Sequence, residues 1–257
     1  MSPTPQRTDR VDLLPVRVYE NEADMGQAAA DDMTAILRSA IAERGEASVI
    51  VATGNSQLAF LRALRVAPGI DWSRVHVFHM DEYIGIDPEH RASFPRFLRE
   101  HFLSHVEGAT FHPVSGDPER VAAICAEYEA ELRAHPADAV ALGFGENGHL
   151  AFNDPPYADF EDPVWAKVVR LDSVSRRQQV GEGHFDAFDE VPTHAITLTV
   201  PALLAAKRVL CIVPEARKAE AVRACLTEPV SEDRPGSVLR TVGHAALYLD
   251  PDSAAKL

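Results

Sequence analysis

The sequence predicts an α/β protein with a doubly wound, mostly parallel sheet and helices on both faces, a Rossmann-like arrangement of three layers. Two observations lead to this prediction. Several short apolar segments, such as residues 48–52 and 208–213, lack the alternation of polar and apolar residues that a half-exposed strand shows. Amphipathic segments with helical spacing separate them, and strands that helices cover on both faces have this uninterrupted apolar character.

In the first half of the chain, strands and helices are expected to alternate from residue 16 onward. Asn21 is a suitable N-cap, and apolar residues recur at helical spacing from Met25 to Ile41. The run at 48–52 ends at a Thr-Gly pair, which indicates a buried strand that enters a tight turn. The expected elements are a strand at 16–19, a helix after Asn21, a strand at 48–52, a helix at 56–64, a strand at 75–79 and helices at 91–105 and 118–134.

The second half continues the alternation. The expected elements are strands at 138–142, 194–199 and 208–213, a helix at 216–226 and a strand at 245–249. Because no repeat or long linker interrupts this pattern, we expect residues 16–257 to form a single α/β domain, preceded by a flexible N-terminal arm at 1–15. The polar, proline-rich segment 154–162 is expected to be a mobile loop.

Composition excludes several classes of protein. The 257 residues include 39 acidic and 25 basic side chains, a net charge of −14, and 46% are hydrophobic, which excludes wholesale disorder. An acidic surface without a segregated basic face repels nucleic acid, so no nucleic-acid partner is expected. The first ten residues contain no apolar run, and no segment approaches the roughly 20 apolar residues of a membrane span. We therefore expect a cytoplasmic protein without a membrane partner.

The cysteines and histidines do not indicate a disulfide framework or a metal site. Cys125, Cys211 and Cys225 are odd in number and widely separated, so we interpret them as buried thiols. His101 and His105 have the spacing of some zinc ligands, as part of a probable helix, but position 102 is Phe where zinc proteases have Glu. Two further histidines lie on an expected strand, at positions 76 and 79. No metal is expected.

Ligands in such sheets bind outside the carboxyl ends of the strands, so the turns after the strands are the candidate sites. The first unusual turn is Thr53-Gly54-Asn55-Ser56, where a glycine allows a sharp bend and a helix then begins. Backbone N–H groups and hydroxyls at such a place suit a small phosphate. The turn lacks the spacing of nucleotide-binding loops, and a plain turn with an N-cap is the alternative.

Two more turns carry ionisable groups. Asp81 and Glu82 directly follow the expected strand 75–79. Acids at the end of a strand are either catalytic groups, caps of the next helix or solvent-exposed side chains. The glycine-rich segment 143–148 precedes His149, and Asp154 follows five residues later, where it is able to fold back and orient the imidazole. Three glycines bring the backbone close to a ligand, which favours a functional interpretation of His149.

Together these turns resemble the glucosamine-6-phosphate deaminase (isomerase) family, which shares a superfamily with the 6-phosphogluconolactonases. The family's T-G-S/T-P loop, N-M-D-E-Y turn, G-H-x-x-F-N-E-P turn and G-x-x-K-A helix start are similar to residues 53–57, 79–83, 145–155 and 215–219. The resemblance covers about residues 16–249 and implies a sugar-phosphate isomerase domain. It implies a deaminase that makes fructose 6-phosphate and ammonia from a small sugar phosphate without a cofactor, and it leaves a homo-oligomer open.

The resemblance also implies roles for individual residues. Asp81 is the base that moves the proton of C2, with a pKa raised by burial and by Glu82. His149 opens the sugar ring, and Asp154 is its carboxylate partner. The phosphate is implied to lie on Thr53, Gly54, Asn55, Ser56, Lys218 and an arginine, for which we favour Arg177 over Arg176.

The sequence departs from the family pattern at four positions, three in these motifs and one in the segment that forms a lid in the family. It has Gln57 for the usual Pro, Phe94 for Tyr, Asn147 for Asp and Asp154 for Glu. Asn147 carries no charge but is able to hydrogen-bond substrate or His149, so the acid that orients His149 is Asp154 or Glu146. The S-S-L and T-R stretches of allosterically activated members are missing, which argues against such activation. The alternatives are a 6-phosphogluconolactonase and, from a different class, a non-catalytic sugar-phosphate sensor.

Overall fold

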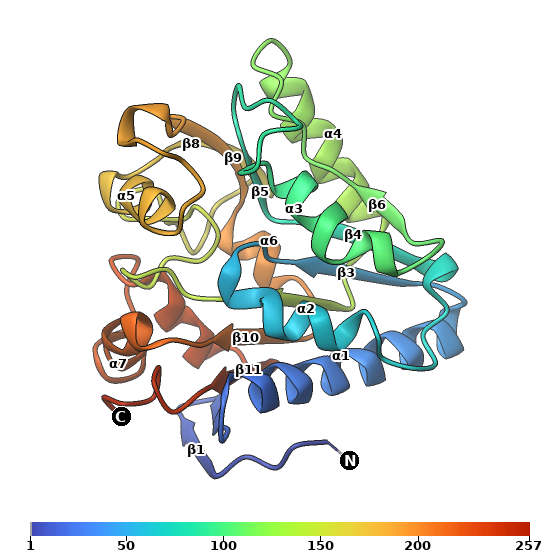
Figure 1. Cartoon of the computed structure of the whole chain (residues 1–257), viewed down its shortest axis with the longest axis vertical. Coiled ribbons are helices and arrows are strands. Elements are labelled where there is room, and N and C mark those ends of the chain that lie inside the picture. Colours follow the sequence, from blue (N-terminus) through green and yellow to red (C-terminus); the bar gives the residue numbers. More distant parts are fainter. Residues whose placement is uncertain (1) are drawn as a thin grey trace.

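The computed structural model describes residues 2–257, which form a large sheet, a small sheet beside it and the helices that cover them (Figure 1). The strands are β1 (Arg7–Val11), β2 (Leu14–Val18), β3 (Ala47–Val51), β4 (Val75–His79), β5 (Asp81–Tyr83), β6 (Thr110–His112), β7 (Ala139–Leu142), β8 (Ala166–Arg170), β9 (His194–Leu198), β10 (Val209–Val213) and β11 (Ala245–Leu249).

Helices alternate with most of these strands. The α-helices are α1 (Glu22–Arg44), α2 (Leu58–Leu64), α3 (Phe94–His101), α4 (Val121–Ala134), α5 (Ser173–Gly181), α6 (Val200–Leu204) and α7 (Ala219–Thr227). Short 3-10 helices are η1 (Asn55–Gln57), η2 (Trp72–Arg74), η3 (Leu103–His105), η4 (Phe188–Glu190), η5 (Ala216–Lys218) and η6 (Pro235–Thr241). Asn21 caps α1 by accepting a hydrogen bond from the backbone N–H of Asp24, as predicted.

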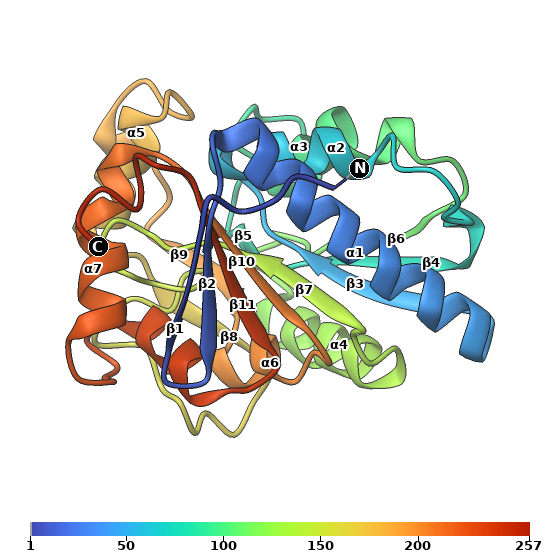
Figure 2. The same cartoon turned by 90° about the horizontal axis from the view of Figure 1, so that it is seen from below.

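Within residues 2–257, the large sheet has eight strands in the order β1-β2-β11-β10-β7-β3-β4-β6. Every neighbouring pair is parallel except β1 and β2. Helices α1, α2 and α3 cover one face, and α4 and α6 cover the other (Figure 2). The predicted doubly wound, mostly parallel sheet is confirmed.

Alternate residues of each central strand enter two separate hydrophobic cores. In β3, Val49 and Val51 pack with α1 and α2, whereas Ile50 packs in the core that contains residues of α4 and α7. All five residues of β3 are buried. This double burial is the reason for the uninterrupted apolar runs in the sequence.

The N-terminal segment differs from the expectation. Part of the predicted arm, Arg7–Val11, forms strand β1 and pairs antiparallel with β2 at the sheet edge. The sequence of β1 is RTDRV and it is mostly exposed, so backbone hydrogen bonds rather than apolar burial hold it. A polar edge strand has no apolar signal in the sequence, which explains why the prediction missed it.

The small sheet is the second difference. It has the order β5-β9-β8 and is antiparallel, and it takes up β9, which was expected in the main sheet. Strand β5 follows β4 after a single residue, Met80, so the chain bends from one sheet into the other at Asp81. A small third core that includes Tyr83, Phe152 and Phe185 packs against this sheet.

Two of the three cysteines are buried as predicted. Cys211 and Cys225 are buried, and Cys125 is half-buried. Burial raises the pKa of each thiol. These groups are therefore protonated at neutral pH.

Candidate active site

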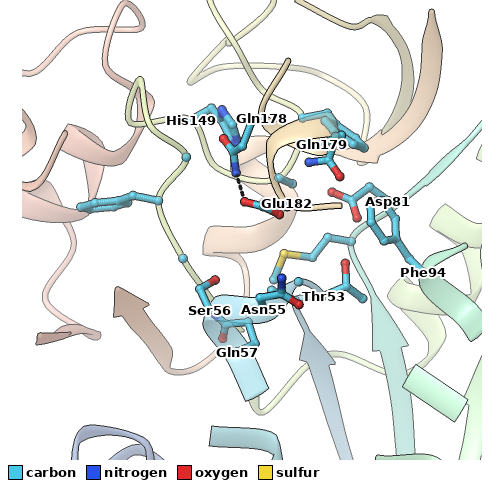
Figure 3. Close-up of a pocket in the computed structure, with 18 of the residues that line it drawn as sticks. Thr53, Asn55, Ser56, Gln57, Asp81, Phe94, His149, Gln178, Gln179 and Glu182 are labelled. Carbon is cyan, nitrogen blue, oxygen red and sulfur yellow. Dashed lines mark hydrogen bonds between the residues drawn. The ribbon is translucent and has the colours of Figure 1, made fainter. Parts of the chain in front are cut away.

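The turns after β3, β4, β7 and β10 converge on one pocket at the carboxyl ends of the strands (Figure 3). The pocket thus brings together the three motifs of the sequence and Lys218. Its wall also includes residues from α5 and the segment after it. The lining residues are Ala52, Thr53, Gly54, Asn55, Ser56, Gln57, Met80, Asp81, Phe94, Gly143, Phe144, Gly145, His149, Ala151, Phe152, Gln178, Gln179, Glu182, His184 and Lys218.

The loop after β3 has the conformation that a phosphate site needs. Gly54 has a φ of 105°, a region that other residues rarely adopt, and η1 begins at the next residue. The first N–H groups of a helix have no partner inside it, so those of Asn55 and Ser56 are available to an anion. The Gln57 amide donates to the carbonyl of Ile212 over 3.1 Å and ties the loop to β10.

Lys218 supplies the positive charge of this side of the pocket. The residue is 3% exposed, and no hydrogen bond or ion pair to its ammonium group is found within residues 2–257. Burial, followed by repulsion from Arg217, lowers the pKa of Lys218. A buried cation without a partner is costly, so an anionic ligand at this position would stabilise it.

Asp81 and Glu82 have different surroundings. Asp81 lines the pocket and is 8% exposed, and burial, with the nearby Glu82, raises its pKa to about 8. Glu82 is directed away from the pocket and accepts hydrogen bonds from Ser93 Oγ at 2.8 Å and from the N–H of Tyr83 at 2.9 Å. Burial raises the pKa of Glu82 to about 7. Asp81 is therefore the acid that reaches a ligand.

His149 is oriented by a polar network. Its Nδ1 lies 2.7 Å from Asn147 Oδ1 and 2.8 Å from Asp154 Oδ1. Asn147 Nδ2 and Ser175 Oγ also donate to Asp154, at 2.7 and 2.9 Å. Both neighbours of Nδ1 are acceptors, so Nδ1 carries the proton and Nε2 is the nitrogen left for a ligand. A Cβ at Gly145 would lie 2.0 Å from the ring, so this imidazole position requires glycine.

The carboxylate partner of His149 is thus Asp154 and not Glu146. Burial opposes ionisation of Asp154, but its attraction to His149 and three hydrogen-bond donors outweigh burial and lower its pKa. Glu146 is exposed and pairs with Arg217 at 3.2 Å.

The structure does not bring the predicted arginine to the pocket. Arg177 is exposed, with its guanidinium 5.8 Å from the centroid of the Phe188 ring. Arg176 donates to the carbonyls of Phe188 and Val191 and lines a different depression beside Pro155. The segment forms α5, which was not predicted, and helical spacing directs positions 176 and 177 away from the pocket.

The same helical spacing explains the residues that sequence reasoning missed. Gln178, Gln179 and Glu182 line the pocket, and Ser175 donates to Asp154. Counted from Ser175 they lie three, four and seven positions on, a spacing that puts them on one face of α5 and its continuation. Glu182 is the charged member of this group. This periodicity, in a segment with few apolar residues, was the available signal.

Among the described residues, the group whose ligand atoms are close enough for a metal ion contains His76 but not His79, His101 or His105. His79 is buried, its Nε2 accepts from the N–H of Val114 at 2.7 Å, and burial lowers its pKa to about 3. His76 points elsewhere and lies with Glu46 and His135, and one ligand atom of each lies within 4.8 Å of the others. This group is near the start of β4, at the opposite end of the strand from Asp81.

Fold and site together define a doubly wound α/β protein with a polar pocket that combines a buried lysine, a buried acid whose pKa is raised and an oriented imidazole. Residues 20–248 match the family of glucosamine-6-phosphate isomerases/6-phosphogluconolactonase, and the chain belongs to this family. Within residues 2–257, no helix combines the length and apolar character needed to cross a membrane.

Relatives named glucosamine-6-phosphate deaminase are similar over most of the chain. The protein of Bacillus cereus (strain G9842) is 30% identical over 243 residues, which are 95% of this chain and 88% of the relative. The protein of Exiguobacterium sibiricum is 31% identical over 226 residues, 86% of each chain.

Solved structures show the same fold. A monomeric glucosamine-6-phosphate deaminase superimposes with a TM-score of 0.85 at 26% identity, covering 94% of this chain and 99% of that protein. The 6-phosphogluconolactonase of Trypanosoma brucei has a TM-score of 0.78 at 16% identity, covering 98% of this chain and all of that one, and it shows the fold alone.

Proposed function

We propose that the protein is a glucosamine-6-phosphate deaminase, which converts glucosamine 6-phosphate and water into fructose 6-phosphate and ammonia. The observation that supports this most is the convergence of Asp81, His149 and Lys218 on one pocket. The names of the relatives that cover most of the chain agree with it. In this proposal the enzyme combines an aldose–ketose isomerisation with hydrolysis of a C–N bond.

The first step is to hold the phosphate. Lys218 and the N–H groups of Gly54, Asn55 and Ser56 lie around one side of the pocket, and the hydroxyl of Thr53 adds a further donor. A phosphate there would gain charge-assisted hydrogen bonds and would satisfy the buried lysine. Fixing the sugar in this way makes the following proton transfers effectively intramolecular.

The second step opens the sugar ring. Nε2 of His149 takes the proton of the C1 hydroxyl and returns it to the ring oxygen, so the open-chain aldose forms. The negative charge of Asp154 stabilises the imidazolium that exists between these two transfers. Asn147 and Ser175 keep the Asp154 carboxylate in place through their hydrogen bonds.

The third step moves a proton between carbons. Asp81 removes the C2 proton while the carbonyl oxygen O1 takes a proton from water, giving an enolamine, and Asp81 then returns its proton to C1. The ketose imine then adds water and releases ammonia. A base is most effective when its pKa is close to the working pH, and the pKa of about 8 for Asp81 meets this condition better than an exposed Asp.

The experiment that tests the proposal is to incubate the purified protein with glucosamine 6-phosphate in D₂O and measure ammonia and the product. We expect ammonia, fructose 6-phosphate and solvent deuterium at C1. The control is 6-phosphogluconolactone, whose hydrolysis breaks no C–H bond. Hydrolysis of the lactone without ammonia release would instead identify a lactonase, and binding of sugar phosphates without turnover of either would identify a sensor.

Two predictions from the sequence stay predictions: a cytoplasmic location and the absence of a nucleic-acid partner. The sequence leaves open whether the protein forms a homo-oligomer. Gel filtration with light scattering gives the oligomeric state directly.

A further inference from the structure

Glu182 places a second carboxyl group in the wall of the pocket, besides Asp81. It follows α5 directly, and Figure 3 shows its side chain projecting into the pocket between His149 and Asp81. The side chain is 10% exposed. No step of the proposed reaction uses it.

The contacts of Glu182 leave it negatively charged. Its Oε1 accepts from Gln178 Nε2 at 2.7 Å and from an Arg217 guanidinium nitrogen at 2.6 Å, and its Oε2 lies 3.3 Å from His184 Nε2. Burial opposes ionisation, but these three partners outweigh it and lower the pKa to about 2. Glu182 is thus a carboxylate at every working pH.

Arg217 does not neutralise this charge fully. It lies between Glu182, Glu146 at 3.2 Å and Glu215 at 2.5 Å, so one guanidinium serves three carboxylates. On Oε2, His184 is the only partner within hydrogen-bond or ion-pair distance among the described residues, and a carboxylate oxygen accepts more than one hydrogen bond. The Oε2 atom therefore has capacity for a donor from a ligand.

The pocket consequently holds two opposite charges. Lys218 is a cation without a partner, Glu182 is an anion, and Asp81 is mostly protonated at neutral pH. A complementary ligand carries a negative group and a positive group. Glucosamine 6-phosphate has both when its amine is protonated, whereas a phosphorylated sugar or lactone with a hydroxyl at C2 has only the negative one.

We infer that Glu182 binds the ammonium group on C2 of the substrate and selects amino-sugar phosphates over phosphates that have a hydroxyl there. This inference rests on the proposed function. The position agrees with the chemistry, because the nitrogen is attached to the carbon whose proton Asp81 removes, and both side chains line the same pocket.

The test compares two unreactive ligands that differ in one group: 2-amino-2-deoxyglucitol 6-phosphate and glucitol 6-phosphate. Neither contains a carbonyl, so calorimetry measures binding alone. The wild-type protein should prefer the amino ligand by about 10-fold or more, the range of a charge-assisted hydrogen bond. In Glu182→Gln this preference should disappear, because the amino ligand binds more weakly while glucitol 6-phosphate binds equally or more tightly without the repulsion of the carboxylate.

The matched control is Glu146→Gln, which, like Glu182→Gln, removes one carboxylate that pairs with Arg217. Glu146 is exposed, pairs with Arg217 and does not line the pocket, so Glu146→Gln should keep the preference. Equal weakening of both ligands in Glu182→Gln would mean that Glu182 only holds α5 in place, and a retained preference would also overturn the inference. If wild-type protein releases no ammonia from glucosamine 6-phosphate, the proposed function fails first and the inference fails with it.

Discussion

The two walls of the pocket differ in how they are built. One wall consists of the turns after β3, β4, β7 and β10, whose residues follow the strands at once. The other consists of residues of α5 and of the segment after it, Gln178, Gln179, Glu182 and His184. Turn residues are placed by the backbone of the strand before them. Residues on a docked helix depend on which face turns inward, so each wall should respond differently to substitution.

The largest effect is expected on the strand side. Asp81→Asn keeps the shape of the pocket but removes the base, so kcat should fall by about 10²–10⁴-fold, the usual loss for a general base. Ligand binding should change little. Turnover is measured by ammonia release and binding by calorimetry with the unreactive amino ligand. A kcat close to that of the wild type would rule out Asp81 as the base.

Substitution of Lys218, on the strand side of the pocket, should change substrate affinity and protein stability in opposite directions. In Lys218→Met the phosphate loses a charge-assisted partner, so KM should rise by about 10- to 100-fold. The variant also removes a buried cation that lacks a partner, so its free energy of unfolding should increase. Urea unfolding without ligand checks the second part. A variant that loses stability together with affinity would show that Lys218 is a structural residue.

The pH dependence follows from the pKa of Asp81. Only the carboxylate form is a base, so kcat/KM should rise with pH up to an apparent pKa of about 8. Stability has the opposite sign. The folded protein keeps the proton between pH 4 and pH 8 while the unfolded chain loses it, so stability falls with pH by up to about 1.4 kcal/mol per unit. Glu82, whose pKa is about 7, adds a fall of the same sign at lower pH. Asp81→Asn should therefore remove the fall between pH 7 and pH 8 and reduce it below pH 7, as thermal unfolding at a series of pH values would reveal.

The smallest effect is expected for the arginines that the sequence assigned to the phosphate. Arg177→Ala should change KM by less than about 2-fold and stability by less than about 0.5 kcal/mol, since its side chain is exposed. Arg176→Ala should lower stability more, because the guanidinium binds two backbone carbonyls. A large rise in KM for Arg177→Ala would mean that α5 rearranges when the substrate binds, and that the sequence assignment was correct.

The sequence by itself determined six of the eight strands described for the main sheet, β2, β3, β4, β7, β10 and β11, and the turns that follow the central ones. Residues 75–79 and 245–249 are strands with the predicted limits. The sequence predicts such strands because burial on both faces requires an uninterrupted apolar segment. In β10, for example, every residue is apolar and buried. Strands β1 and β6, the small antiparallel sheet and α5 were missed. These elements are short, polar or half-exposed, so the local sequence pattern carries little information about them.

Only the tertiary structure decided how the site residues interact. It selected Asp154 over Glu146 as partner of His149 and directed Glu82 away from the pocket. It also left Arg176 and Arg177 outside the pocket and placed Glu182 in its wall. Each outcome depends on contacts between segments distant in sequence, such as Ser175 with Asp154 and Glu182 with Arg217. The raised pKa of Asp81 has the same origin, because burial is a property of the packed protein and not of the residue.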